Sequence, residues 1–286
     1  MRVAFQGELG AFSEEAVRSF FGDAAEPVPR REFRDVGQAV ARGEAEFGAL
    51  PVENTLAGGV GASYDVLARE PLRVIGEVVV AIHHCVLGVA GSGLQGIRRV
   101  LSHPVALAQA QRFFESHPAV EAVAVYDTAG AAREVVKLGD PHTAALASRS
   151  AAARYGLTIL AENVEDRPDN QTRFLIVTAS PASPLPQGEG SRTQPISTGP
   201  WKTTVLLETA NSPGALVGAL QCFADRGINL SKLESRPGDV PWTYRFFLEF
   251  DTDANTQAAS EALAGVAAHS TSVRVLGTYP KAVGAE

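Results

Sequence analysis

The chain has 286 residues, of which 45% are hydrophobic and 20% charged, so it has enough apolar material for more than one folded unit. Its formal net charge is −7 and it contains no run of lysine and arginine, which argues against nucleic-acid binding. No apolar stretch is long enough to span a membrane, and residues 1–7 lack the apolar core of a signal peptide, so we expect a cytoplasmic protein without a membrane partner. Cys85 and Cys222 lie in separate apolar contexts, so we expect two reduced thiols and no metal site.

Short apolar strands alternate with helical patterns over residues 1–179. Strands are expected at residues 3–6, 47–51, 74–82, 86–89, 100–101, 120–125, 144–147 and 157–160. Helices are expected from a Ser13 cap with Glu14 and Glu15 in the first turn, at residues 105–114 and 129–136, and through Tyr155. This alternation predicts an α/β domain with mostly parallel sheets.

The extended run 72–89 is typical of a crossing between two lobes. We expect lobe one at about 1–78 plus 156–179 and lobe two at about 79–155, with a ligand cleft between them.

Residues 180–201 are rich in Pro, Ser and Gly and read as a linker. The pattern after it predicts strands at 203–208, 228–234, 242–250 and 272–277 and helices at 214–226 and 255–269. This βαββαβ order indicates a ferredoxin-like domain over residues 202–280.

Two polar segments follow strand ends in the first domain. Residues 7–13 could bring backbone amides to an anion, although a tight turn capped by Ser13 is the simpler interpretation. Glu53, Asn54 and Thr55 could contact a ligand or could cap a turn, and the sequence favours neither reading. The pairs Ser102-His103 and His83-His84 lack catalytic or metal-binding partners and are interpreted as structural.

The run Thr172-Arg173-Phe174 follows an acidic loop and enters an apolar strand. A hydroxyl beside a guanidinium suits chemistry on a carboxylate substrate, with a proton donor next to an anion clamp. Alternatively, Arg173 pairs with a nearby carboxylate such as Asp166 or Asp169.

Taken together, these motifs resemble the prephenate dehydratase family. One signature is carried by Tyr155, Leu157, Leu160, Asp166, Thr172, Arg173, Phe174, Leu175 and Val177. A regulatory signature is matched at residues 230–237, with a companion at Gly214-Ala215-Leu216. The resemblance implies a two-lobed catalytic domain, similar to type II periplasmic binding proteins, followed by an ACT regulatory domain. Because the chain begins directly with the first strand, we expect the monofunctional form without a fused chorismate mutase.

The resemblance also implies an activity, which is the decarboxylating dehydration of prephenate to phenylpyruvate by a hydro-lyase that needs no cofactor. Thr172 is then the proton donor, Arg173 holds a carboxylate, and Phe174 packs against the substrate ring or supports the loop. The expected substrate contacts come from Ser13, Glu53, Asn54, Thr55, Thr128 and Asn170.

The regulatory ligand implied is L-phenylalanine, bound in a homodimer or homotetramer. Its expected contacts are Gly214, Ala215, Leu216, Glu234, Ser235, Arg236 and Pro237. Residues 128–132 also resemble the arogenate-using relatives, so arogenate is an alternative substrate. A non-catalytic amino-acid-binding module is the alternative to an enzyme.

Overall fold

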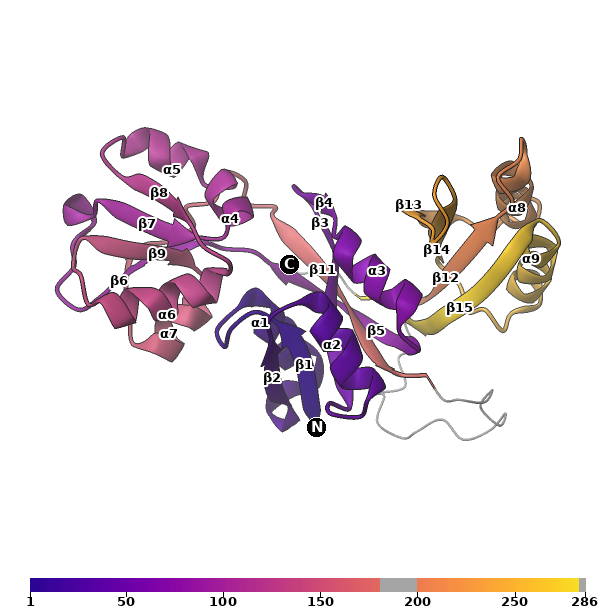
Figure 1. Cartoon of the computed structure of the whole chain (residues 1–286), viewed down its shortest axis with the longest axis horizontal. Helices are drawn as coiled ribbons and strands as arrows, with labels where there is room; N and C mark the ends of the chain where they lie inside the picture. The colour runs from indigo at the N-terminus through magenta and orange to yellow at the C-terminus, as the bar shows by residue number, and fades with distance from the viewer. Residues whose placement is uncertain (181–199, 283–286) are drawn as a thin grey trace.

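The computed structural model describes residues 1–180 and 200–282. They form three bodies in a row, with lobe one in the centre, lobe two on one side and the C-terminal domain on the other (Figure 1). Most of the predicted linker, residues 181–199, lies outside the described residues.

Lobe one is built on a sheet with strand order β2-β1-β3-β11-β5, and β4 pairs with β3. The strands are β1 (Arg2–Gln6), β2 (Glu26–Arg30), β3 (Phe47–Asn54), β4 (Gly58–Gly59), β5 (Leu72–Ala81) and β11 (Gln171–Ala179). The helices are α1 (Phe12–Phe21), η1 (Gly22–Ala24), α2 (Phe33–Ala41) and α3 (Gly61–Arg69).

Lobe two has the strand order β10-β6-β9-β7-β8. The strands are β6 (Cys85–Gly88), β7 (Arg99–Ser102), β8 (Glu121–Ala124), β9 (Thr143–Ala147) and β10 (Thr158–Ala161). The helices are η2 (Leu94–Gly96), α4 (Pro104–Ala108), α5 (Gln111–Ser116), α6 (Thr128–Leu138) and α7 (Arg149–Tyr155).

The two-lobed α/β architecture is confirmed, but the sheets are not mostly parallel. The pairs β1–β2, β1–β3, β7–β8 and β7–β9 are parallel, whereas the strands that carry the chain across the lobes, β5, β6, β10 and β11, pair antiparallel. Strands β5 and β6 carry the chain out to lobe two, whereas β10 and β11 bring it back, so the outgoing and returning strands run in opposite directions where they pair. The second crossing also comes later than expected, since β10 pairs with β6 in lobe two and only β11 returns to lobe one.

Several local elements differ from the sequence expectations. Helix α1 begins at Phe12 after Ala11, so Ser13 lies inside the helix and does not cap it. The expected helix 105–114 is two short helices, α4 and α5. Strand β2 carries Pro27 and Pro29, a composition that argues against a strand, and it is tolerated here because β2 is at the sheet edge.

The C-terminal domain has the expected βαββαβ order, with sheet order β13-β14-β12-β15. Its elements are β12 (Trp201–Thr209), α8 (Ala215–Ala224), β13 (Leu230–Pro237), β14 (Tyr244–Phe250), α9 (Gln257–Ala268) and β15 (Ser270–Pro280). Helices α8 and α9 cover the sheet face away from lobe one (Figure 1). The expected strand residue Trp242 lies before β14 and is 82% exposed.

The opposite face of this sheet packs on lobe one through a shared apolar core. Leu206, Phe247 and Leu276 join lobe-one residues in one buried cluster, where the Phe247 and Tyr64 rings lie 4.8 Å apart. At the contact of β15 with β5, a Cβ on Gly277 would lie 2.0 Å from the carbonyl oxygen of Val74. Because the two backbones approach this closely, the C-terminal domain and lobe one meet along a tight interface.

Both cysteines are free thiols, as expected. Within residues 1–180 and 200–282, no helix has the length and apolar character needed to cross a membrane.

Candidate active site

The candidate site lies at the ends of two neighbouring strands of lobe one. In the β3–β11 pair, Thr172 is the register partner of Asn54. The Asn54 Nδ2 group donates to the Thr172 Oγ1 atom over 2.9 Å. A hydroxyl that accepts a hydrogen bond still has its own hydrogen to donate, so this contact fixes the Thr172 oxygen and leaves its O–H available.

An amide network surrounds this pair and joins the two lobes. Asn54 Nδ2 also lies 2.8 Å from Asn170 Oδ1, and Asn170 is fully buried. From lobe two, Gln109 accepts from Asn170 Nδ2 over 3.0 Å and donates to Asn54 Oδ1 over 3.4 Å. Because the buried Asn170 amide is hydrogen-bonded to a residue of each lobe, the network fixes Thr172 relative to both lobes.

His84 extends the network at the crossing between the lobes. Its Nε2 atom lies 3.2 Å from Gln109 Oε1, an acceptor, so Nε2 carries a hydrogen. The side chain is 2% exposed, and burial lowers the pKa of His84, which favours the neutral ring. The sequence interpretation of His84 as structural missed this contact with the site, and the only signal available was its position in the crossing segment.

Asp166, a member of the first signature, positions Gln109 through the backbone. Its carboxylate accepts from the amides of Gln111 and Arg112 at the start of α5 over 3.0 and 2.9 Å. Its own amide donates to the Gln109 carbonyl over 2.7 Å. Asp166 therefore holds the loop before β11 against lobe two and does not pair with Arg173.

Arg173 lies on the opposite face of β11 from Thr172, because successive side chains on a strand alternate. Its Nη1 atom is 2.9 Å from Glu77 Oε2 and 3.0 Å from Glu249 Oε2, and its Nη2 atom is 3.1 Å from Glu53 Oε2. Burial by itself would lower the pKa of Arg173, but the Glu249 and Glu77 carboxylates outweigh it and raise the pKa. The structure therefore does not bring Arg173 beside Thr172 as an anion clamp; the guanidinium is already held by three carboxylates.

The other expected site residues separate into distinct places. Phe174 is 2% exposed and packs in the apolar core between the lobes, so it supports the strand from within. Glu53 points with Arg173 toward the C-terminal domain. Thr55 lies with the network, where it donates to the Asp169 carbonyl over 3.1 Å and accepts from the Gln171 amide over 3.0 Å.

Ser13 and Thr128 lie in the two helices, α1 and α6, that follow a second contact between the lobes. The loop before α1 meets the start of α6, where Asp127 accepts from the Gly130 and Glu8 amides over 2.7 and 3.3 Å. Thr128 is the first residue of α6, and Ser13 is 8% exposed within α1. No described contact joins either side chain to the Thr172 network, so the structure leaves these two expectations apart from it.

The predicted regulatory residues of β13 face two ways. Glu234 and Arg236 point toward lobe one, where Arg236 Nη2 pairs with Asp65 Oδ2 over 3.1 Å. Ser235 and Pro237 alternate with them and are exposed. Gly214, in a left-handed conformation at φ 82°, precedes Ala215 and Leu216 at the start of α8. Glu234 and Arg236 thus contact lobe one, and their predicted role in binding a ligand stays a prediction.

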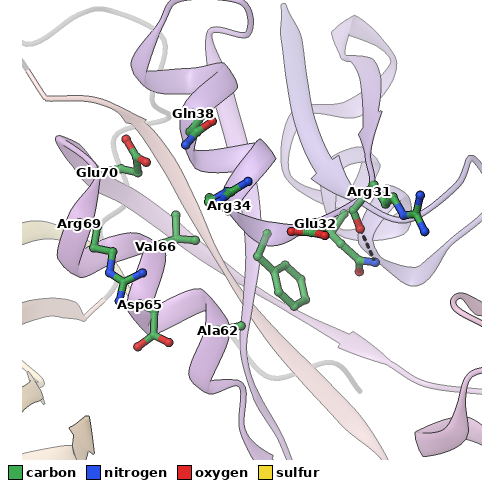
Figure 2. Close-up of a pocket in the computed structure, with 11 residues that line it drawn as sticks. Arg31, Glu32, Arg34, Gln38, Ala62, Asp65, Val66, Arg69 and Glu70 are labelled. Carbon is green, nitrogen blue, oxygen red and sulfur yellow. Dashed lines mark hydrogen bonds between the residues drawn. The ribbon is translucent and has the colours of Figure 1, made fainter. Parts of the chain in front are cut away.

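A groove of about 530 Å³ lies elsewhere on lobe one, between α2 and α3. Figure 2 shows Arg34, Arg69 and Asp65 around it, with Val66 at its wall. None of the predicted site residues lines it. Among the residues that the structure describes, no group of three or more His, Cys, Asp and Glu side chains could hold a metal ion.

The family model described as prephenate dehydratase matches residues 3–182. The chain is 38% identical over 290 residues to an arogenate dehydratase/prephenate dehydratase 2 of Arabidopsis thaliana, covering 98% of this chain and 73% of that protein. It is 36% identical to a bifunctional chorismate mutase/prephenate dehydratase of Pseudomonas aeruginosa, over 99% of this chain and 74% of that one. The chain belongs to the prephenate dehydratase family. Since dehydratases of this family are hydro-lyases, the prediction of a carbon–oxygen lyase is confirmed.

Solved structures agree with this assignment. A prephenate dehydratase from Arthrobacter aurescens in complex with L-Phe superposes with a TM-score of 0.85 at 34% identity, covering 98% of this chain and 90% of that one. GqqA, described as a novel type of quorum quenching acylase, gives a TM-score of 0.86 at 35% identity, with 98% of both chains covered. The predicted fold class, two α/β lobes followed by an ACT-like domain, is confirmed.

Proposed function

We propose that this chain converts prephenate to phenylpyruvate, with Thr172 as the hydrogen-bond donor to the leaving hydroxyl. The observation that carries the proposal is the Asn54–Thr172 contact of 2.9 Å, which orients the Thr172 oxygen as an acceptor and does not use its hydrogen. Membership of the prephenate dehydratase family supports the same reaction.

The reaction needs little more than orientation and one proton. The bond from the ring to the departing carboxylate breaks, and its electron pair enters the ring as carbon dioxide leaves. The C–O bond to the ring hydroxyl breaks with its pair on oxygen, and one proton turns that hydroxide into water. Because the product ring is aromatic, the barrier depends on holding the substrate and assisting the hydroxyl, and a positioned donor contributes about a hundredfold to ten-thousandfold.

The Thr172 hydroxyl acts within a partly buried network of fixed dipoles. Asn54, Asn170 and Gln109 donate and accept in set directions, so they need no reorganisation when charge develops on the leaving oxygen. Ser13, Thr55 and Thr128 are the candidates for contacts to the rest of the substrate. The Arg173 guanidinium has no place in this proposal as a substrate clamp, because it faces away from the network.

The deciding experiment replaces Thr172 and measures kcat and KM separately. Thr172→Ala is expected to lower kcat by about a hundredfold or more while KM stays within a few-fold, and Thr172→Ser is expected to keep most activity. Thr178→Ala is the matched control, because Thr178 lies on the same strand and donates to the Glu46 carbonyl. Undiminished turnover by Thr172→Ala would exclude this role.

Arogenate is the alternative substrate. Arogenate dehydratase 2 of Petunia hybrida is 38% identical to this chain over 295 residues, which supports testing both compounds. Parallel assays with prephenate and arogenate separate the two, and a chain that turns over neither would return to the alternative of an amino-acid-binding module.

The structure does not favour acyl hydrolysis. That chemistry uses a nucleophile activated by an adjacent base. Over the described part of the chain, no hydrogen bond joins a serine, threonine or cysteine side chain to a histidine ring. We therefore propose the dehydratase activity alone.

We also infer that L-phenylalanine regulates the chain through the ACT-like domain, in a homodimer or homotetramer. The related Arthrobacter aurescens prephenate dehydratase is described in complex with L-Phe, which supports this ligand. Residues at the start of α8 and on the exposed face of β13, namely Gly214, Ala215, Leu216, Ser235 and Pro237, are the candidates for its contacts. Strand β13 is at the edge of its sheet, so a second copy could pair beside it. Saturating phenylalanine should lower activity and raise the melting temperature, and no effect on either would refute the regulation.

A further inference from the structure

A buried ionic cluster lies between lobe one and the ACT-like domain. Three cations face three carboxylates in it: Arg173, Lys202 and Lys232 against Glu53, Glu77 and Glu249. The Glu77 and Glu249 side chains are each 2% exposed, and Lys202 is 8% exposed. Charges removed from water to this degree are held only by their partners, so the cluster is sensitive to the placement of each member.

The ACT-like domain supplies half of this cluster. From β14, Glu249 Oε2 lies 3.0 Å from Arg173 Nη1, and from β13, Lys232 Nζ lies 3.0 Å from Glu53 Oε1. Burial by itself would raise the pKa of Glu53, but the hydrogen bond and charge of Lys232, together with Arg173, outweigh it and lower the pKa. The Glu53 carboxylate is therefore held in its charged form between two cations of different domains.

The lobe-one members of the cluster are the chain neighbours of the site residues. Arg173 follows Thr172, Glu53 precedes Asn54, and both pairs are register partners in the β3–β11 ladder. Because side chains alternate along a strand, the site residues lie on one face of the β3–β11 pair and their chain neighbours in the ionic cluster lie on the other face. A shift of Arg173 or Glu53 is a shift of the peptide units that hold Thr172 and Asn54.

Strand β13 is fitted closely to the loop that follows β3. A Cβ on Gly59 would lie 2.9 Å from Glu234 Oε2, and a Cβ on Gly61 would lie 2.4 Å from Arg236 Nη1. With Lys232, these two side chains form one row facing lobe one. Strand β13 therefore contacts lobe one through three charged side chains next to the end of β3, where Asn54 lies.

We propose that Lys232 and Glu249 of the ACT-like domain are positioning residues for the reaction, acting through Glu53 and Arg173 on Asn54 and Thr172. This inference rests on the proposed dehydratase function for its kinetic consequence, while its structural consequence is independent of that function. A small misplacement of a reacting group can cost about a hundredfold in rate, so a change in the ACT-like domain should reach kcat.

The test uses the full chain with Lys232→Met and Glu249→Gln, each of which removes a charge and keeps the side-chain length. Arg226→Met and Glu261→Gln are the matched controls, because these two residues form a partly exposed ion pair with each other in the same domain. We expect each cluster variant to lower kcat by about tenfold or more with KM changed less than about threefold, and the controls to match the wild type. Lys232→Arg, which keeps the charge, should restore most of the rate.

A second readout does not depend on activity. Backbone amide hydrogen exchange at residues 53–55 and 171–173 should be faster in the cluster variants than in the controls, because the ladder between β3 and β11 loosens. If the wild type turned over neither prephenate nor arogenate, the proposed function would be wrong. The hydrogen-exchange rates would still show whether the ACT-like domain positions residues 53–55 and 171–173. If Glu249→Gln did not fold, Lys232→Met would carry the test, since Lys232 contacts the partly exposed Glu53 at the cluster margin. Cluster variants with control-like kcat and control-like exchange would overturn the inference.

Discussion

Replacing Arg173 with methionine should destabilise the protein through the charges it leaves behind. Met fills a similar volume, but Glu77 and Glu249, each 2% exposed, lose their shared guanidinium. Breaking a buried ion pair by removing one partner costs about 3–5 kcal/mol. Lys202 stays within 3.2 Å of Glu77 and 3.7 Å of Glu249, so we expect the lower end, about 3 kcal/mol.

Urea unfolding measures this loss directly. Both tryptophans, Trp201 and Trp242, are in the C-terminal domain, so their fluorescence reports that domain while circular dichroism reports the whole chain. The control is Arg149→Met, because Arg149 is 64% exposed and forms a surface pair with Glu162. We expect the unfolding free energy of that control to stay close to that of the wild type, because an exposed ion pair contributes little to stability.

A double variant, Arg173→Met with Glu249→Gln, sharpens the result. It removes one of the two stranded charges, so it should recover part of the stability lost in the single variant. An Arg173→Met protein as stable as the Arg149→Met control would refute the interpretation of Arg173 as the centre of a buried ionic cluster.

Two further outcomes test the packing and the site network. Gly277→Ala places a Cβ about 2.0 Å from a backbone carbonyl oxygen of β5, so this variant should have a lower melting temperature than the wild type. Gly93→Ala is the control, because a Cβ there has no atom within 4 Å, and its melting temperature should not change. Equal melting temperatures of the two variants would contradict the tight interface. Burial lowers the pKa of His84 in the folded chain. Below about pH 6.5 the unfolded chain therefore binds a proton at this histidine more readily than the folded chain does. The free energy of unfolding is highest above that pH and decreases as the pH falls. In His84→Gln, the free energy of unfolding should decrease less between about pH 7.5 and 5.5 than in the wild type. An unchanged slope would show that other groups cause the decrease.

Patterns of neighbouring residues predict most of the secondary structure and the boundary between the domains. Period-two and period-3.6 hydrophobicity located most strands and helices, and the abrupt composition change at residue 181 separated the domains. Strand β2 was missed because its prolines argue against pairing, and only its place at the sheet edge removes that objection. An edge position is a tertiary property, so no local pattern contains it.

The same distinction applies to the site. The sequence predicts Asn54 and Thr172 as site residues because each carries a polar group at the end or the start of a strand, and the role of Thr172 comes from the family resemblance. The sequence does not predict Gln109 as a site residue. Its contacts with Asn54 and Asn170 join residues that are 55 and 61 positions apart in the chain, and no local pattern shows such contacts. The three carboxylate partners of Arg173, namely Glu77, Glu249 and Glu53, are 96, 76 and 120 positions away in the chain. The sequence alternative that Arg173 pairs with a nearby acid such as Asp166 is therefore wrong.

The Thr-Arg-Phe signature is best understood as three consecutive positions with three different surroundings. Thr172 faces the amide network, Arg173 faces the carboxylates shared with the C-terminal domain, and Phe174 enters the core between the lobes after a register shift in the β3–β11 ladder. A hydroxyl that assists a leaving group must be held to within a fraction of an ångström. Strand β11 can hold it so closely because contacts at three consecutive residues fix the strand on both of its faces. Under the proposed function, the arginine would contribute to the site by fixing the strand and would not need to touch the substrate.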